Sequence, residues 1–261
     1  LWPIALTVSW GFNILRITVL IVIGEYVSPD LAVNGFHSFA GWLLFTTLAI
    51  GVLFIAQSVP ALHGGGLVSQ DIGNLRDDPV AALIVPFIAF MLSAVIVQAF
   101  WEYPALGYPL QVAIMAGALL WMRRRFFLQI KLSFDPVSIG IGLVVGLIWV
   151  WFSDVQQEDT LGLDTLGSTA MIAWVLCRTL GTTLLVPLIE EAFFRGYILA
   201  RLDTGTALAK AIAIVLSTLL FALLHGRIIL AGIAGLLFGA AMLCRGRLGD
   251  AVVAHAVANT T

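Results

Sequence analysis

The stretch VPLIEEAFFRGYILARLD, residues 186–203, places two adjacent glutamates and an arginine in a segment that is otherwise apolar enough for a membrane. Ionisable side chains inside a spanning segment cost about 3 kcal/mol each on insertion scales, and they usually mark a functional site. On a helix Glu191 and Arg195 are i,i+4 neighbours and can pair, whereas Glu190 lies about 100° further round. The spacing therefore predicts that one glutamate is neutralised structurally, while the other faces elsewhere and needs a partner.

The composition is that of a membrane protein. Of the 261 residues, 61% are hydrophobic and 11% are charged, whereas soluble domains are about half apolar and about a quarter charged. The net charge of −2, with no basic stripe, argues against a nucleic-acid partner. Cys177 and Cys244 lie in separate apolar segments without a second ligand at metal-binding spacing, so we interpret both as packing residues.

A spanning helix needs about 20 mainly apolar residues. The candidate spans are residues 3–24, 39–59, 80–100, 108–122, 136–152, 169–202, 207–225 and 229–244, and a last one begins near residue 250. This pattern predicts an all-α fold, a polytopic membrane bundle of about eight to nine helices that span a lipid bilayer. Because the chain begins at Leu1 and ends soon after the last helical pattern begins, we expect it to be a fragment at both ends.

The connections between these spans differ in charge. Basic residues lie in residues 123–131 and 245–247 and at Arg201 and Lys210, whereas residues 25–30 and 153–164 are acidic. Alternating the spans puts the basic connections on one side of the membrane and the acidic ones on the other. The positive-inside rule makes the basic side cytoplasmic.

One connection is rich in glycine and polar residues. It reads PALHGGGLVSQDIGNLRDDP, residues 60–79, and its composition is typical of a linker. We therefore predict two membrane modules, residues 1–60 and 80–261, joined by a linker over residues 61–79.

Two further clusters lie downstream of the glutamates. FALLH puts Phe221 and His225 one helical turn apart, and HAVAN does the same for His255 and Asn259. A histidine and a glutamate can activate a water molecule, while a His-Asn pair can donate hydrogen bonds to an oxyanion. The alternative is structural: the acids would form an inert ion-pair cluster, and the histidines would make hydrogen bonds between helices.

EEAFFR, FALLH and HAVAN, in this order, resemble the EExxxR, FxxxH and HxxxN motifs of the type II CAAX prenyl endopeptidase and bacteriocin-processing family. The resemblance implies an intramembrane glutamate protease over residues 80–261. Glu190 would be the base, acting with His225 on the water, and His255 and Asn259 would form the oxyanion site. Glu191 and Arg195 would hold the architecture.

The predicted helices leave one geometric difficulty. His225 ends its helix, and a full-length span over residues 229–244 would separate it in depth from His255 by about 15 Å at 1.5 Å per residue. The segment 229–244 must therefore tilt, or be partly re-entrant, for the site to assemble.

The first module has its own polar residues. Arg16 lies inside a span, in an NxxR pattern, and His37 lies in GFHSFAGW at the start of the next span. By itself Arg16 is explained by snorkelling or by pairing with Glu25. The two motifs nevertheless resemble the C-terminal part of exosortases, bacterial membrane transpeptidases that use a Cys, an Arg and a His. Arg16 and His37 would be the latter two.

The order of the modules resembles the exosortase E/protease fusion of the VPEID-CTERM sorting system. That resemblance implies a multi-pass protein of the bacterial inner membrane, acting on membrane-associated proteins that include those with C-terminal sorting signals. Because the matching exosortase cysteine is absent from this sequence, we do not expect it to transpeptidate.

Two alternatives remain for the chemistry. We expect no cofactor, but Glu190, His225 and His255 could instead bind zinc as a metalloprotease, although no HExxH pair is present. A non-catalytic membrane chaperone or transporter could also use these buried charges for packing or for a proton path.

Overall fold

A computed structural model describes residues 2–27, 74–152 and 162–261. Every regular element in these residues is a helix, and none of them forms a strand. The predicted all-α class is confirmed for this part of the chain. The predicted span 39–59, most of the predicted linker and His37 lie outside it.

The chain divides into two compact units, Leu1–Ile72 and Gly73–Thr261. In the first unit the structure describes helix α1, Trp2–Tyr26, which covers the first predicted span and carries Arg16. The second unit holds all residues of the predicted protease site. The functional assignment of the two modules stays a prediction.

The helices of the second unit follow the predicted spans closely. They are α3 (Pro79–Phe100), α4 (Tyr108–Gln129), α5 (Pro136–Phe152), the continuous series from α6 (Ser168–Leu180) through α7 (Val186–Glu191) to α8 (Ala200–Leu202), α9 (Ala207–Leu223), α10 (Ile228–Arg245) and α11 (Leu248–Ala258). Short 3₁₀ turns occupy Leu75–Asp77, Pro104–Gly107 and Leu163–Thr165.

Not all of these helices are long enough to cross a membrane. In the described part of the chain, four segments are long and apolar enough to cross a membrane. They are Pro79–Phe100, Pro104–Gln129, Ser168–Leu202 and Ile228–Arg245. Three shorter apolar helices accompany them, Pro136–Phe152, Ala207–Leu223 and Leu248–Ala258. A helical multi-pass membrane protein is thus supported, whereas the total of eight to nine spans stays a prediction.

Helix ends are set by local sequence. The Asp78 side chain accepts hydrogen bonds from the backbone N–H groups of Val80 and Ala81 at 2.7 and 3.2 Å, and Pro79 takes the first helical position of α3. This is a capped N-terminus, with proline where no N–H is needed. At the other end of the chain Gly246, with φ of 67°, ends α10 in a left-handed conformation that glycine adopts without strain.

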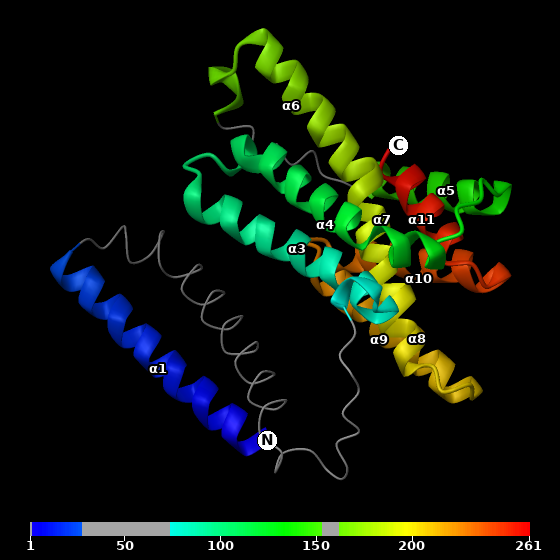
Figure 1. The fold of residues 1–261 in the computed structure, drawn as a ribbon, viewed down its shortest axis with the longest axis horizontal. Coiled ribbons are helices and arrows are strands. Elements are labelled where there is room, and N and C mark those ends of the chain that lie inside the picture. The colour runs from blue at the N-terminus through cyan, green and yellow to red at the C-terminus, as the bar shows by residue number, and fades with distance from the viewer. Residues whose placement is uncertain (1, 28–73, 153–161) are drawn as a thin grey trace. The chain divides into compact units, whose positions relative to one another are not determined.

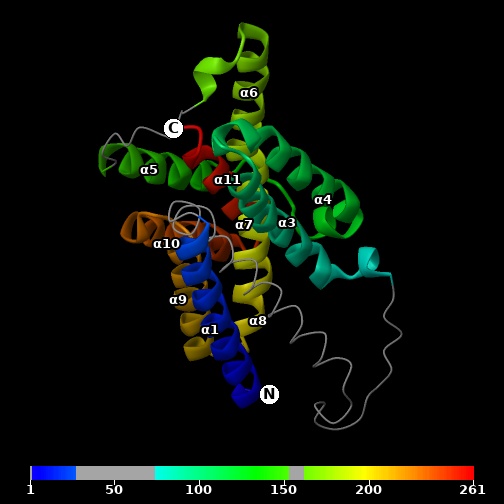
Figure 2. The same cartoon turned by 90° about the vertical axis from the view of Figure 1, so that its left-hand side faces the viewer.

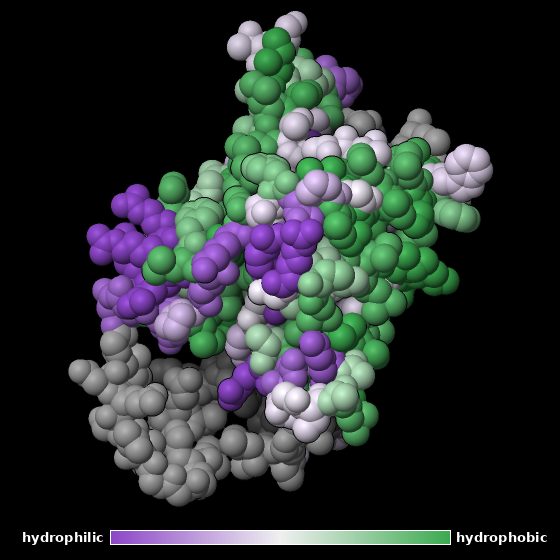
Figure 3. Space-filling view, turned by 90° about the vertical axis from the view of Figure 1, so that its right-hand side faces the viewer, coloured by the Kyte–Doolittle hydropathy of each residue, from purple (hydrophilic) through white to green (hydrophobic). Residues whose placement is uncertain are grey.

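The surface of the second unit carries many large apolar side chains. Phe100, Phe134 and Trp151 are among the most exposed, and Figure 3 shows broad hydrophobic areas between separate groups of polar residues. Soluble monomers rarely expose contiguous apolar patches of this kind, so the surface fits a lipid environment.

Helices α5 and α10 cross the long α6–α8 helix at a steep angle in both views of the ribbon (Figures 1 and 2). Helix α10 packs against α9, α11 and α5. Of the two predicted arrangements of the segment 229–244, tilted or partly re-entrant, the structure shows a helix that is steeply inclined to the α6–α8 helix.

Charged residues join the start of α5 to the turn between α10 and α11. Asp135 forms ion pairs with Arg245 and Arg247, and Arg247 donates to both carboxylate oxygens of the fully buried Asp250 at 2.9 and 3.0 Å. Lys131, at the end of the basic segment 123–131, also lies close to Gly249, just after the basic turn 245–247. The cytoplasmic assignment of this side stays a prediction.

Two glycines of α5 let α11 approach closely. A Cβ atom on Gly142 would overlap the carbonyl oxygen of Ala254, and one on Gly146 would lie 3.1 Å from that of Ala258. Since α11 carries His255, this contact between α5 and α11 sets the position of one predicted catalytic residue.

We predict that Gly142→Ala lowers the thermal unfolding midpoint of the detergent-purified protein, because overpacking of this kind costs about 1–3 kcal/mol. Gly140→Ala is the matched control, since its added methyl group would meet open space. Alanine in a helix interior is favoured over glycine by about 0.5–1 kcal/mol, so the control should unfold at the same or a higher temperature. Equal midpoints for the two variants would show that α11 does not depend on close packing at residue 142.

Candidate active site

The ion pair predicted between Glu191 and Arg195 is present and almost fully buried, at 0% and 1% exposure. Arg195 Nη1 donates to Glu191 Oε1 at 3.0 Å, and Nη2 donates to the carbonyl oxygen of Gly235 on α10 at 2.7 Å. The guanidinium also lies over the ring of Phe221, 4.6 Å from its centroid. Arg195 therefore links three helical segments.

Gly235 makes this link sterically feasible. A Cβ atom at this position would lie 3.1 Å from Arg195 Nη2, 3.1 Å from Thr218 Cγ2 and 3.2 Å from Phe221 Cδ1. A side chain here would press on the guanidinium and on its aromatic neighbour. The absence of a side chain at Gly235 thus allows Arg195 to reach the backbone of α10.

Glu191 also fixes the orientation of His255. The Glu191 Oε1 that accepts from Arg195 lies 2.9 Å from His255 Nδ1, and the imidazole stacks on Phe238 with centroids 4.6 Å apart and planes at 16°. Because Nδ1 faces a carboxylate, it carries the ring proton of a neutral imidazole. The other nitrogen, Nε2, lies 4.0 Å from Glu190 Oε2.

Glu190 is buried in the same helix but differs from Glu191 in what it faces. It is 4% exposed, and within the described residues its Oε2 has no hydrogen-bond partner. Oε2 of Glu191 likewise has none in the described ranges, but Glu191 carries the compensating Arg195. A buried carboxylate oxygen without a partner is costly, so Glu190 Oε2 is poised to accept a proton or a hydrogen bond.

A cavity of about 660 Å³ adjoins Glu190. The four residues predicted to be catalytic all line it: Glu190, His225, His255 and Asn259. Glu191 and Arg195 do not belong to its described lining. The structure thus places the two adjacent glutamates in different surroundings, one at the cavity and one in the ion pair.

His225 lies just after the end of α9, half-buried at the cavity. Its Nδ1 is 2.8 Å from the carbonyl oxygen of Phe221, and the two rings lie 4.5 Å apart. Phe221 also contacts His255 at a ring distance of 5.7 Å. The one-turn spacing of Phe221 and His225 therefore fixes one imidazole and brings it near the other, with Nε2 as the nitrogen that is left for a ligand.

Asn259 caps the end of α11 and is exposed toward the cavity. Its Nδ2 donates to the carbonyl oxygen of Thr182 at 2.8 Å, which occupies one of its two N–H groups. Thr182 lies in the π-helical segment Gly181–Leu185, and a second π-helical segment, Ala192–Leu199, follows Glu191. Such segments are rare and frequently lie at functional sites.

The described residues include no group of three His, Cys, Asp or Glu side chains that is arranged to hold a metal ion. Glu190, His225 and His255 line one cavity but do not form such a group. Zinc binding by these three residues, the alternative named above, stays an untested prediction.

Arg178 and Thr182 are among the residues of this cavity that were not predicted. Arg178 carried the same sequence signal as Glu190, an ionisable side chain within the predicted span 169–202. Thr182 acts through its backbone carbonyl and could not be found from residue type.

The sequence was compared with known protein families, curated proteins and solved structures. Residues 172–261 match the model of the Rce1-like type II CAAX prenyl endopeptidases, and residues 2–54 match that of the transmembrane exosortases. Both resemblances are confirmed. The first match spans 90 of the 261 residues, and it covers Glu190, His225, His255 and Asn259. No curated protein and no solved structure matches the chain.

Within the exosortase match, Arg16 lies in helix α1, whereas His37 falls outside the described residues. That Arg16 and His37 act together as the Arg and the His of an exosortase site stays a prediction.

We predict that Glu191→Gln destabilises the protein far more than Glu190→Gln. Removing the Glu191 charge leaves Arg195 buried without its partner, which typically costs about 3–5 kcal/mol. Glu190→Gln removes a buried charge that has no compensating arginine, so its thermal unfolding midpoint should equal or exceed that of the parent. Thermal unfolding of the three proteins in detergent measures this difference. Similar losses in both variants would mean that the two glutamates serve one structural cluster.

Proposed function

We propose that this chain is an intramembrane endopeptidase that hydrolyses peptide bonds of membrane-associated proteins with water activated by Glu190 and His225. The observation that supports it most is the position of Glu190. Its carboxylate has an unpartnered oxygen, and it lines a cavity together with two histidines and an asparagine. A cavity of about 300–1,000 Å³ is the size range of ligand sites.

In the proposed reaction a water molecule is held between Glu190 and Nε2 of His225. Glu190 accepts a proton as the water oxygen forms a bond to the scissile carbonyl carbon, and the carbonyl π electrons move to its oxygen. Collapse of the tetrahedral intermediate breaks the C–N bond, and Glu190 returns the proton to the leaving amine. The products are a carboxylic acid and an amine, a proton then passes from the acid to the amine, and Glu190 ends in its starting state.

The oxyanion of that intermediate needs hydrogen-bond donors. We propose that the free N–H of the Asn259 amide and His255 Nε2 supply them, the latter when the His255 ring is protonated. The contact of Nδ1 with Glu191 Oε1 supports this role, because it orients the ring so that Nε2 faces away from Glu191.

The substrates that we propose are membrane proteins, including those with C-terminal sorting signals, in the bacterial inner membrane. The exosortase match at residues 2–54 supports this association. Arg16 and His37 would then belong to the sorting module, and the protease residues to the second unit.

We predict that Glu190→Gln lowers kcat/KM for a sorting-signal peptide by about 10²–10⁴-fold, the usual contribution of a general base. Glu102→Gln is the control for removal of a glutamate charge, since Glu102 is exposed in the turn after α3. Each protein is assayed in detergent with and without a chelator, and the cleavage position is found by mass spectrometry.

The arms of this experiment separate the candidate functions. Loss of cleavage in Glu190→Gln alone, without an effect of the chelator, supports the glutamate protease. Loss with the chelator supports zinc. Cleavage that is equal in the parent and in Glu190→Gln contradicts a catalytic role for Glu190 and favours the non-catalytic chaperone or transporter.

A further inference from the structure

A proline lies inside the long α6–α8 helix, just before the two glutamates. It is Pro187, within the continuous helix Ser168–Leu202 and three residues before Glu190. Proline has no backbone N–H, so it cannot donate the hydrogen bond that a residue inside a helix normally makes. In a regular α-helix the missing bond would be the one to the carbonyl of Thr183, four residues earlier. The proline therefore leaves one carbonyl group of this helix without its usual donor.

The π-helical segment Gly181–Leu185 decides which carbonyl group that is. In a π-helix each carbonyl accepts from the N–H five residues later, and the N–H of Val186 donates in this way to the carbonyl oxygen of Gly181. The α-helical donor for the carbonyl of Thr182 would be Val186, which is used by Gly181. The π-helical donor would be Pro187, which has no N–H. Neither helical donor is thus left for the Thr182 carbonyl.

Asn259 supplies the donor that the helix does not. Its Nδ2 donates to the carbonyl oxygen of Thr182 at 2.8 Å, which joins the end of α11 to the α6–α8 helix. Buried or half-buried carbonyl groups are almost always paired, so this acceptor favours a bond to a neighbouring side chain. The Thr182 hydroxyl donates to the carbonyl of Arg178 at 2.8 Å instead. The backbone of Thr182, and not its side chain, therefore holds Asn259.

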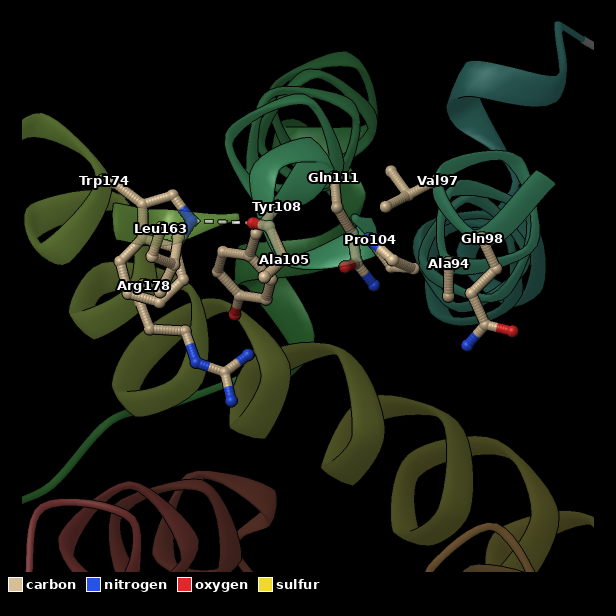
Figure 4. A pocket seen from close by; sticks show the side chains of 10 residues that line it. All are labelled: Ala94, Val97, Gln98, Pro104, Ala105, Tyr108, Gln111, Leu163, Trp174 and Arg178. Carbon is tan, nitrogen blue, oxygen red and sulfur yellow. Dashed lines mark hydrogen bonds between the residues drawn. The ribbon is translucent and has the colours of Figure 1, made fainter. Parts of the chain in front are cut away.

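Contacts on both sides set the register of the π-helical segment. Before it, Trp174 donates to the carbonyl oxygen of Ala105 at 2.7 Å (Figure 4). This bond lies at a smaller cavity of about 280 Å³, which Arg178 lines as well as the larger one. At the start of the segment a Cβ atom on Gly181 would overlap the hydroxyl oxygen of Tyr108, so the helix passes close to α4 here. After the segment, the buried ion pair described above fixes the helix.

The bond to Thr182 gives Asn259 a defined orientation. The Asn259 side chain is exposed and lies one residue beyond the end of α11, where helices fray. An exposed amide without a fixed partner samples several rotamers, whereas a hydrogen bond to a helix backbone selects one. Since Asn259 and Glu190 line one cavity, the Thr182 carbonyl fixes an amide group at the proposed active site.

We propose that Pro187 is a positioning residue: together with the π-helical segment it leaves the Thr182 carbonyl free to hold the Asn259 amide at the cavity. The effect of Pro187 on the reaction rests on the proposed protease function, in which Asn259 donates to the oxyanion. The bond between Asn259 and Thr182 does not depend on that function. The bond and the reaction are therefore tested by separate measurements.

The test replaces Pro187 in two ways that differ in a single group. Pro187→Ala restores a backbone N–H. Pro187→lactic acid, introduced by nonsense suppression, has the same methyl side chain but an ester oxygen in place of the N–H. Both lack the proline ring, so a packing role of the ring predicts equal effects. Pro86→Ala is a further control, since it makes the same change at a buried proline inside α3 that is not among the described lining of the larger cavity.

We expect the restored N–H of Pro187→Ala to bond to the helix carbonyls and to release Asn259. For the sorting-signal peptide kcat should fall about three- to tenfold, the factor that corresponds to one net intramolecular hydrogen bond. KM should not change, because the amide acts on the intermediate and not on the bound substrate. Pro187→lactic acid should restore the kcat of the parent, and Pro86→Ala should keep it. In an Asn259→Ala background, Pro187→Ala should lower kcat no further.

The bond itself is observed by NMR of the Asn259 side chain. The chain contains four asparagines, so labelling of asparagine with ¹⁵N gives few side-chain amide signals, and Asn259→Gln assigns the one that belongs to residue 259. We expect a slowly exchanging amide proton in the parent and in Pro187→lactic acid, and a rapidly exchanging one in Pro187→Ala. Pro187→Ala should nevertheless unfold at the same or a higher temperature than Pro187→lactic acid, because it alone regains a helix hydrogen bond.

Other results overturn the proposal in distinguishable ways. An Asn259 signal that is the same in Pro187→Ala and in the parent refutes the role of Pro187, whether or not the peptide is cleaved. Equal losses of kcat in Pro187→Ala and Pro187→lactic acid would assign the proline ring to packing. Release of Asn259 without a change in kcat refutes positioning for the reaction. Release of Asn259 in a protein whose parent cleaves nothing keeps Pro187 as the residue that frees the Thr182 carbonyl and contradicts the protease.

Discussion

One carboxylate oxygen holds the site together. Glu191 Oε1 accepts from Arg195 at 3.0 Å and lies 2.9 Å from His255 Nδ1, so it joins the α6–α8 helix to α11. Arg195 extends the chain to the backbone of α10 through Gly235. A buried charge network of this kind is favourable only when every member is paired, because the solvation that it loses is large. The surrounding helices must therefore keep their positions for it to persist.

The rest of the second unit is arranged around that requirement. Glycines on α5 admit α11 at close range, and the Asp135, Arg247 and Asp250 contacts fix the first turn of α11. The ring of Phe221 contacts the imidazoles of both His225 and His255, and the ring of Phe238 stacks on that of His255. Because Arg195 is paired with Glu191, Glu190 can face the cavity, where its Oε2 has no hydrogen-bond partner among the described residues.

The steep crossing of α10 also has a functional consequence. A helix parallel to its neighbours would leave His225 and His255 at different depths. Since α10 lies across the α6–α8 helix (Figure 1), both histidines line one cavity. The same crossing lets Gly235 meet Arg195. One change of helix direction therefore serves both the ion pair and the cavity.

The sequence by itself determined the helical membrane class, most helix bounds in the described part, and the different surroundings of Glu190 and Glu191. These follow from local rules, since apolar length and the 3.6-residue period depend on nearby residues alone. It also indicated, from loop and helix lengths, that the segment 229–244 must tilt or be partly re-entrant. Only the tertiary structure decided that Asn259 donates to the Thr182 carbonyl and that Arg178 joins two cavities. Those contacts join residues far apart in the chain, and one of them is made by a backbone oxygen that every residue possesses, so neither residue type nor spacing could have identified it.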